Sequence, residues 1–278
     1  MKNLAPCLPD ERICYPKKDK DMEYLIICLS AIIASGLTLF SGFGLGTLLL
    51  PVFAIFFPID VAVALTAIVH LLNNFFKLVL LGKHADKKVA MKFGFPAIIA
   101  AFMGAWFLVR LSEMNPITTY HLFSRQFNVL PVKLLVAVMM IIFAIFELVP
   151  KFEKMSFDSK YLAVGGILSG FFGGLSGHQG ALRSAFLIRS GLSKEAFIAT
   201  GVVIACLIDF TRMSVYSAHF SRHFLSDNLL LLIAAALSAF SGALIGNRLV
   251  KKIPMRSIQI VVSIMLIGIA VGLGTGLI

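Results

Sequence analysis

Charge is scarce in this sequence. Asp, Glu, Lys and Arg make up only 14% of its 278 residues, while hydrophobic residues make up 59%, and a soluble domain is usually about a quarter charged. The apolar runs are 23–41, 47–57, 61–81, 93–111, 133–149, 161–176, 181–188, 196–217, 228–249 and 257–278. Most of them reach or approach the roughly 20 residues that a helix needs to cross a bilayer. The sequence therefore predicts an all-α polytopic membrane protein with about eight hydrophobic spans, which we expect in the inner cell membrane.

Acidic residues are the scarcer of the two charge types. The chain has 14 Asp and Glu against 25 Lys and Arg, for a net charge of +11. The basic residues gather in short clusters between the apolar runs, at 17–20, 83–92, 151–160 and 248–256. This distribution is typical of loops that orient a membrane protein against the cytoplasmic face. We therefore expect a lipid bilayer as a partner and no nucleic acid.

Cysteine is also rare, and motifs for catalysis are missing. Cys28 and Cys206 lie in apolar runs, where a thiol behaves as a small hydrophobe, and the spacing of Cys7 and Cys14 matches no zinc pattern. No GxSxG, HExxH or Walker sequence occurs. We expect no enzyme activity, no catalytic residue, no metal site and no cofactor. Residues 1–22 form a polar N-terminal leader in this interpretation, and residues 23–278 form a single membrane domain.

Glycine, in contrast, is concentrated at two places inside apolar segments. The first stretch runs from Ser35-Gly36 to the sequence GFGLGT at 42–47, and the second from Ser169-Gly170 to the sequence GGLSGHQG at 173–180. A helix interrupted inside a bilayer frees backbone groups that find no water, so such breaks are tolerated only in protein or beside a cavity. Paired breaks in the two halves of a chain are a pointer to the binding site of a transporter.

The two breaks belong to an apparent internal repeat. At one fixed offset Ser35 pairs with Ser169, Gly46 with Gly180 and Thr66 with Thr200. We expect one repeat at about 24–150 and a second at about 158–278, each with a glycine-broken helix. If 23–57 crosses the bilayer twice, both repeats have the same orientation; if 47–57 is the returning arm of a re-entrant hairpin, the repeats are inverted. The positive charges divide between these two alternatives.

The breaks supply most of the candidate binding groups. A helix that restarts after a glycine break, at Thr47 in the first repeat, points its N-terminal amides at whatever fills the break, which favours an anion. The second break also carries hydrogen-bonding side chains, and Arg183 follows one turn later. The candidate substrate-binding residues are Gly44, Gly46, Thr47, Asn73, Asn74, His178, Gln179, Gly180 and Arg183. The alternative is that the glycines only allow close helix packing.

Three further polar residues are candidates for coupling or gating. His70 lies on a polar stripe with Asn73, Asn74 and Lys77, so it could carry a proton or simply donate a hydrogen bond between helices. Lys77 lies late in its span and could extend to the interface. Asp209 and Arg212 share a helix face and could form a locking ion pair or a coupling element.

A charge in an apolar segment is costly without a partner, so the counter-ion of Arg183 matters. A bound anion could neutralise this guanidinium, and Asp209 is the alternative partner within the chain.

These residues together resemble the TauE/SafE family of membrane proteins, also called the sulfite exporter or TSUP family. Each break is followed by an apolar run and an Ala/Thr-rich helix, at 62–66 and 196–200. The family's three glycines with a following proline appear as Gly44-Leu45-Gly46 with Pro51, and in the second half as Gly177-His178-Gln179-Gly180 with Ala185. The resemblance implies transport of small anions, notably sulfite and organosulfonates such as sulfoacetate, generally outward.

We therefore expect a secondary transporter, an exporter of a small anion, that works by alternating access between two repeats. The chain carries no nucleotide-binding segment, so an ion gradient or the substrate's own gradient would drive it. The alternatives are a channel-like anion facilitator and a non-transporting membrane scaffold or assembly protein. The small anion is the expected partner besides lipid, and the chain could form a homo-oligomer.

Overall fold

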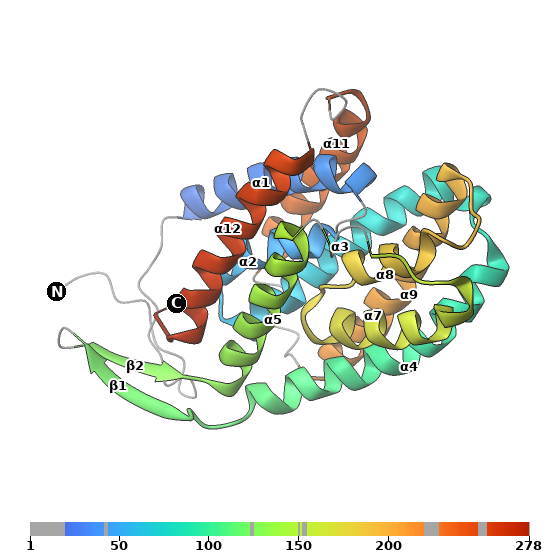
Figure 1. Ribbon diagram of the computed structural model, residues 1–278. Coiled ribbons are helices and arrows are strands. Elements are labelled where there is room, and N and C mark those ends of the chain that lie inside the picture. The colour runs from blue at the N-terminus through green and yellow to red at the C-terminus, as the bar shows by residue number, and fades with distance from the viewer. Residues whose placement is uncertain are drawn as a thin grey trace.

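The computed structural model describes residues 20–41, 44–122, 125–149, 151, 155–219, 228–249 and 255–277. Within these ranges the chain forms helices, one short hairpin and two single 3-10 turns (Figure 1). The α-helices are α1 (Lys20–Ser41), α2 (Leu45–Phe56), α3 (Ile59–Leu81), α4 (Lys87–Ser112), α5 (Pro131–Leu148), α7 (Leu162–Ser176), α8 (Gly180–Leu187), α9 (Lys194–His219), α11 (Leu229–Leu249) and α12 (Met255–Gly274). The turns are η1 (Gly82–His84) and η2 (Ser159–Tyr161). The leader predicted for 1–22 lies almost wholly outside the described residues.

Six of the described helices are long and apolar enough to cross a membrane, and they are α1, α3, α4, α5, α9 and α11. The apolar helix α2 and the apolar part of α12, Gln259–Gly274, are shorter. The helix α8 has 8 residues, which gives it a length of about 12 Å, far less than the roughly 30 Å of a hydrocarbon core. The chain is thus a multi-pass helical membrane protein, with six candidate crossings among the described residues.

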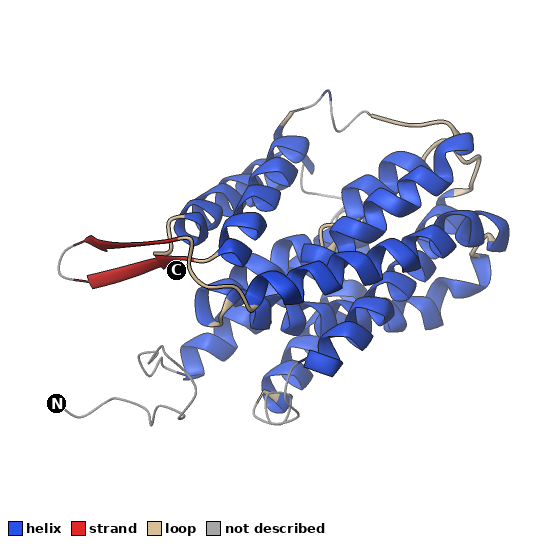
Figure 2. Ribbon diagram, turned by 90° about the horizontal axis from the view of Figure 1, so that it is seen from below, coloured by secondary structure: helices blue, strands red, loops and turns tan. Residues whose placement is uncertain are grey.

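The prediction of an all-α protein is wrong at one place, the segment between α4 and α5. Strands β1 (Thr118–Leu122) and β2 (Arg125–Val129) form an antiparallel hairpin there. Their Thr, Val and aromatic residues favour strands, and the facing Tyr120 and Phe127 rings stack with centroids 5.5 Å apart. The hairpin extends away from the helices (Figures 1 and 2). Its Tyr120 hydroxyl donates to the Thr275 carbonyl at 2.5 Å, which attaches the hairpin to the end of α12.

Glycine allows two close helix contacts between the halves of the chain. The helix α7 packs along α4, where Gly170 meets the backbone of Ala97 and Gly174 meets that of Ala101. In the same way α1 packs along α11, where Gly36 meets Gly246. Small residues let helix backbones approach closely in membranes. For these glycines the close-packing alternative is therefore confirmed.

Two other helix pairs across the halves run antiparallel. On α3 and α9, His70 meets Asp209, and the amide of Asp86, just beyond α3, donates to Thr200 near the start of α9 at 2.9 Å. On α5 and α12, contacts join the start of α5 to Gly274, and Arg256 at the other end donates to carbonyls at the end of α5. Each pair therefore consists of two helices that run in opposite directions.

The second break is a sharp turn between α7 and α8. Gly177 ends α7 in the left-handed region, with φ +81°, where a side chain would be strained. The helix α8 then returns beside α7, so that Phe186 packs on Gly165 and the Ser169 hydroxyl donates to the Gln179 carbonyl at 3.0 Å. The segment is a helical hairpin in which α8 runs back along α7.

The first break joins α1 to α2, and α2 packs on both α1 and α3. Gly44 precedes the helix, which begins at Leu45 rather than at the predicted Thr47, because the amide of Thr47 already bonds to the Gly44 carbonyl at 3.1 Å. Gly42, predicted to be part of this break, lies outside the described residues. Residues 45–54 of α2 are all buried, so the segment that follows the break is enclosed by protein.

Candidate functional site

The structure brings the two glycine breaks together. A Cβ on Gly46 would lie 3.2 Å from the carbonyl oxygen of Gly177, and one on Gly44 would lie 3.8 Å from the amide nitrogen of Gly180. The helices α2 and α8 therefore both begin at one junction, although they are far apart in the sequence. A larger residue at Gly46 would push the two breaks apart, so glycine is needed here for contact between them.

A cavity of about 320 Å³ lies beside this junction. Its walls come from α1, α2, α3, α8, the loop after α8, and α9. The lining residues are Thr38, Gly44, Leu45, His70, Asn74, Lys77, Arg183, Ser184, Leu187, Ile188, Leu192, Lys194, Phe197, Ile198, Gly201 and Val202. Three of them, Lys77, Arg183 and Lys194, carry a positive charge, and the lining contains no Asp or Glu. A cavity with this composition favours a negatively charged ligand.

Lys77 is buried in the wall of this cavity, with 6% of its surface exposed. The sequence also allowed it to extend to the interface, and the structure places it inside instead. In the part of the chain that the structure describes, no hydrogen bond or ion pair joins the Lys77 ammonium group to another residue. A buried ammonium without a partner is costly, so a bound anion would stabilise it.

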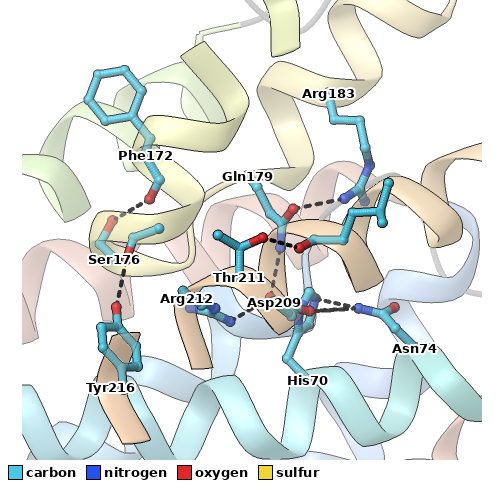
Figure 3. A network of polar contacts seen from close by, with 12 residues as sticks. His70, Asn74, Phe172, Ser176, Gln179, Arg183, Asp209, Thr211, Arg212 and Tyr216 are labelled. Carbon is cyan, nitrogen blue, oxygen red and sulfur yellow. Dashed lines mark hydrogen bonds and ion pairs between the residues drawn. The ribbon is translucent and has the colours of Figure 1, made fainter. Parts of the chain in front are cut away.

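Asp209 makes three hydrogen bonds and one ion pair (Figure 3). One carboxylate oxygen accepts from the Gln179 amide at 3.0 Å and lies 2.8 Å from the Arg212 guanidinium. The other lies 2.5 Å from His70 Nδ1 and 3.2 Å from the Asn74 amide. Each carboxylate oxygen therefore has two polar neighbours. The ion pair expected between Asp209 and Arg212 is confirmed.

Arg183 therefore has no carboxylate of its own. Its guanidinium donates to the Gln179 side-chain oxygen at 3.3 Å, and Gln179 separates it from Asp209. Of the two alternatives for its counter-ion, the ion pair with Asp209 does not form. Asp209 balances the charge of Arg212, so the charges of Lys77 and Arg183 face the cavity without a carboxylate among the described residues.

The predicted site residues divide into two groups. Gly44, Asn74, Arg183 and His70 line the cavity. The other predicted residues do not line it, and these are Gly46, Thr47, Asn73, His178, Gln179, Gly180, Asp209 and Arg212. Most of the second group are buried, and several of them join the two breaks or hold residues of the first group.

Asn73 and His178 belong to this second group and contact other helices. Asn73 accepts a hydrogen bond from the Ser35 hydroxyl at 3.1 Å, which joins α3 to α1. His178 faces away from the cavity: its ring stacks on Phe143 of α5 with centroids 5.0 Å apart, and its Nδ1 lies 3.0 Å from the Ser176 hydroxyl. Its expected role as a direct donor to substrate therefore has no support from its position in this conformation.

The sequence did not single out several residues of the cavity wall. Thr38, Ser184 and Lys194 line the cavity but were not candidates. Ser184 directly follows Arg183. Lys194 begins α9, shortly after the end of α8, and its charge so close to the second break was the signal that could have identified it as a candidate. Thr38 comes from α1, and only the fold shows that this helix reaches the second break.

A comparison with protein-family models gives one match. The model described as Sulfite exporter TauE/SafE matches residues 27–273, nearly the whole chain. Neither the curated proteins nor the solved structures contain a match. The matched range includes both breaks and every residue that lines the cavity.

Proposed function

The chain belongs to the TauE/SafE family of sulfite exporters, and on this basis we propose that it is a secondary transporter that moves a small anion such as sulfite or an organosulfonate out of the cell. TauE/SafE proteins are membrane transporters rather than enzymes. The inner cell membrane is the proposed location. The observation that carries the proposal is the cavity at the junction of the two breaks, where Lys77 and Arg183 face inward without a carboxylate partner.

The anion would bind between these two cations. Asn74 and the start of α2 at Gly44 line the same cavity, so an amide side chain and a helix N-terminus add to the favourable potential. Gln179 would hold the Arg183 guanidinium in place through its 3.3 Å hydrogen bond. The remaining predicted residues would shape the junction behind the site.

We also propose that the two halves are inverted repeats that work by alternating access. The order of helices in the first half, α1 to α5, recurs in the second half as α7, α8, α9, α11 and α12. Under this correspondence α3 packs on its counterpart α9 and α5 on α12, while α1 packs on α11 and α7 on α4. A two-fold axis produces this exchange of partners. The antiparallel course of the counterpart helices supports inverted rather than parallel repeats.

The test of the binding site is substrate counterflow in proteoliposomes with the variant Arg183→Gln. Vesicles loaded with unlabelled sulfite or methanesulfonate receive the labelled anion outside, and carrier-mediated exchange accelerates its uptake. Hydrogen bonds to charged groups contribute about 1.5–3 kcal/mol each, so we expect the affinity to fall by roughly 10-fold to 150-fold. Lys77→Met tests the second cation and should show a loss of similar size.

The matched control is Arg189→Gln, in the same segment of the chain. Arg189 is exposed and lies 3.8 Å from the carboxylate of Asp158, outside the cavity. Its loss should leave counterflow unchanged. Undiminished counterflow in both cavity variants, with folded protein in the membrane, would contradict the proposed site.

Counterflow also separates the proposal from its alternatives. A channel-like facilitator conducts the anion down its gradient, but preloaded anion does not accelerate the entry of label. A scaffold or assembly protein transports neither anion. The cavity favours the transporter over the scaffold, because a scaffold needs no cavity into which Lys77 and Arg183 point without a carboxylate partner.

A further inference from the structure

His70 occupies a position that anion binding alone does not explain. Its ring lines the cavity, and its Nδ1 lies 2.5 Å from a carboxylate oxygen of Asp209 (Figure 3). Because a carboxylate only accepts hydrogen bonds, Nδ1 carries the hydrogen in this contact. The other ring nitrogen, Nε2, then has its lone pair available for a second proton. The Asn74 amide nitrogen lies 3.4 Å from Nε2 and can donate to this lone pair while the ring is neutral.

Four charged groups surround this imidazole. Asp209 and Arg212 face it from α9, Arg183 faces it from α8, and Lys77 lies two turns further along α3 in the same cavity. The described side chains of α2 and α11, which also pack on α3, bring no charge to it. With a neutral His70 the cluster has three positive charges and one negative charge. A second proton on the ring would raise the excess to three, so the doubly protonated ring is disfavoured while the cavity holds no anion.

An anion in the cavity reverses this balance. It would lie beside Lys77, Arg183 and His70, because all three line the same space, and its negative charge favours the imidazolium form. The effect is reciprocal: a proton on His70 strengthens binding of the anion by the same factor that the anion strengthens binding of the proton. Proton and anion therefore bind to the same state of the cavity.

We propose that His70 is the proton-carrying residue of this transporter and that one proton accompanies each anion across the membrane in the same direction, so that the outward gradient of the anion itself drives export. This inference rests on the proposed function. The Nε2 atom accepts a proton from water when the anion enters, and returns it to water on the other side when the anion leaves. Asp209 stays ionised and stabilises the imidazolium through Nδ1. Arg212, Gln179 and Asn74 hold the carboxylate in place.

The variant that tests this role is His70→Asn. The Asn side chain offers an N–H close to the position of Nδ1, so Asp209 keeps a donor, but it cannot take up a second proton. The matched control is His219→Asn at the end of α9, since His219 is partly exposed, lies outside the cavity and is 3.6 Å from Glu113. Both variants replace one histidine, and only the first removes the proposed proton site.

The assay uses proteoliposomes and labelled methanesulfonate, the anion of a strong acid, which keeps a single charge at every pH tested. With the membrane potential clamped at zero by potassium and valinomycin, the inside is made alkaline by one pH unit. One proton per anion then allows about tenfold accumulation. We expect this accumulation in the wild type and in His219→Asn, and no accumulation in His70→Asn, although counterflow in that variant continues at reduced affinity.

The outcomes separate proton coupling and the role of His70 from the proposed transport function. Wild-type protein that shows counterflow but no gradient-driven accumulation overturns proton coupling and leaves the proposed function intact. Tenfold accumulation by His70→Asn overturns the role of His70 and also leaves the proposed function intact. Loss of counterflow for both sulfite and methanesulfonate in the wild type refutes the proposed function itself. If His70→Asn does not fold, the wild type still provides a test, because affinity for methanesulfonate must rise as the pH falls through the titration of the bound state, and a constant affinity overturns the inference.

Discussion

Gly177 combines a left-handed backbone with close contact to the buried Arg212 guanidinium, so its substitution tests both features. The residue has φ +81°, and a Cβ there would lie 2.8 Å from Nη1 of Arg212. The left-handed backbone costs an ordinary residue about 1–2 kcal/mol. Gly177→Ala adds a clash with the guanidinium, whose Nη2 lies 2.8 Å from Asp209. Disruption of a buried ion pair costs about 3–5 kcal/mol when one partner is left alone. Displacement of Arg212 from Asp209 would therefore lower the free energy of unfolding by part of this amount.

The chain offers a control that isolates the backbone contribution. Gly191 also has a positive φ, +69°, but nothing lies within 4 Å of the Cβ that an alanine would add. We therefore expect Gly191→Ala to lower the free energy of unfolding by about 1–2 kcal/mol and Gly177→Ala to lower it by about 2–5 kcal/mol. Reversible unfolding in mixed detergent micelles measures both. Counterflow should persist in Gly191→Ala and fall in Gly177→Ala.

Equal destabilisation by the two substitutions would refute this reasoning. It would mean that the guanidinium of Arg212 moves away from Gly177 at no cost, and therefore that its position beside the second break is not held by Asp209. The importance assigned to the buried ion pair at the junction would then be wrong.

Two further substitutions test the packing around the junction. Gly174→Ala should reduce the folded fraction strongly, because the added Cβ would overlap the carbonyl of Ala101 on α4. The control is Gly268→Ala, which should leave the folded fraction unchanged because nothing lies within 4 Å of its added Cβ. Gel filtration of the solubilised protein compares the two variants. Tyr216→Phe removes the hydroxyl that donates to the Gly174 carbonyl at 2.6 Å, and we expect a loss of about 0.5–1.5 kcal/mol in the same unfolding assay. A neutral Tyr216→Phe would show that this carbonyl is satisfied within α7.

Much of the architecture follows from local sequence patterns. Apolar runs define the helices because a backbone in lipid must bond to itself, and the glycine clusters mark both breaks. The hairpin at 118–129 was missed because its few Thr and aromatic residues lie in a segment too short and too polar to suggest a strand against the helical background. Helix ends shifted slightly, as at Leu45, since the first turn of a helix forms wherever its amides find acceptors.

The candidate site was predicted in part. Arg183, Asn74, His70 and Gly44 do line one cavity, whereas His178 faces Phe143 instead. His178 and its neighbour Gln179 lie on the same tight turn, but His178 faces Phe143 while Gln179 donates to Asp209. The turn at Gly177 sets these two directions.

The sequence by itself determined that this protein lies in a membrane, that two of its apolar segments are broken by glycine, and that a few charges are buried in costly surroundings. Composition and helical spacing decide these points, including the face shared by Asp209 and Arg212, because they depend on neighbours within a few residues. Only the tertiary structure decided that the two breaks meet and that Asp209 neutralises Arg212 rather than Arg183. These outcomes depend on the distances between helices far apart in the chain, and such distances are set by packing. The unpaired charges of Arg183 and Lys77 follow from that packing.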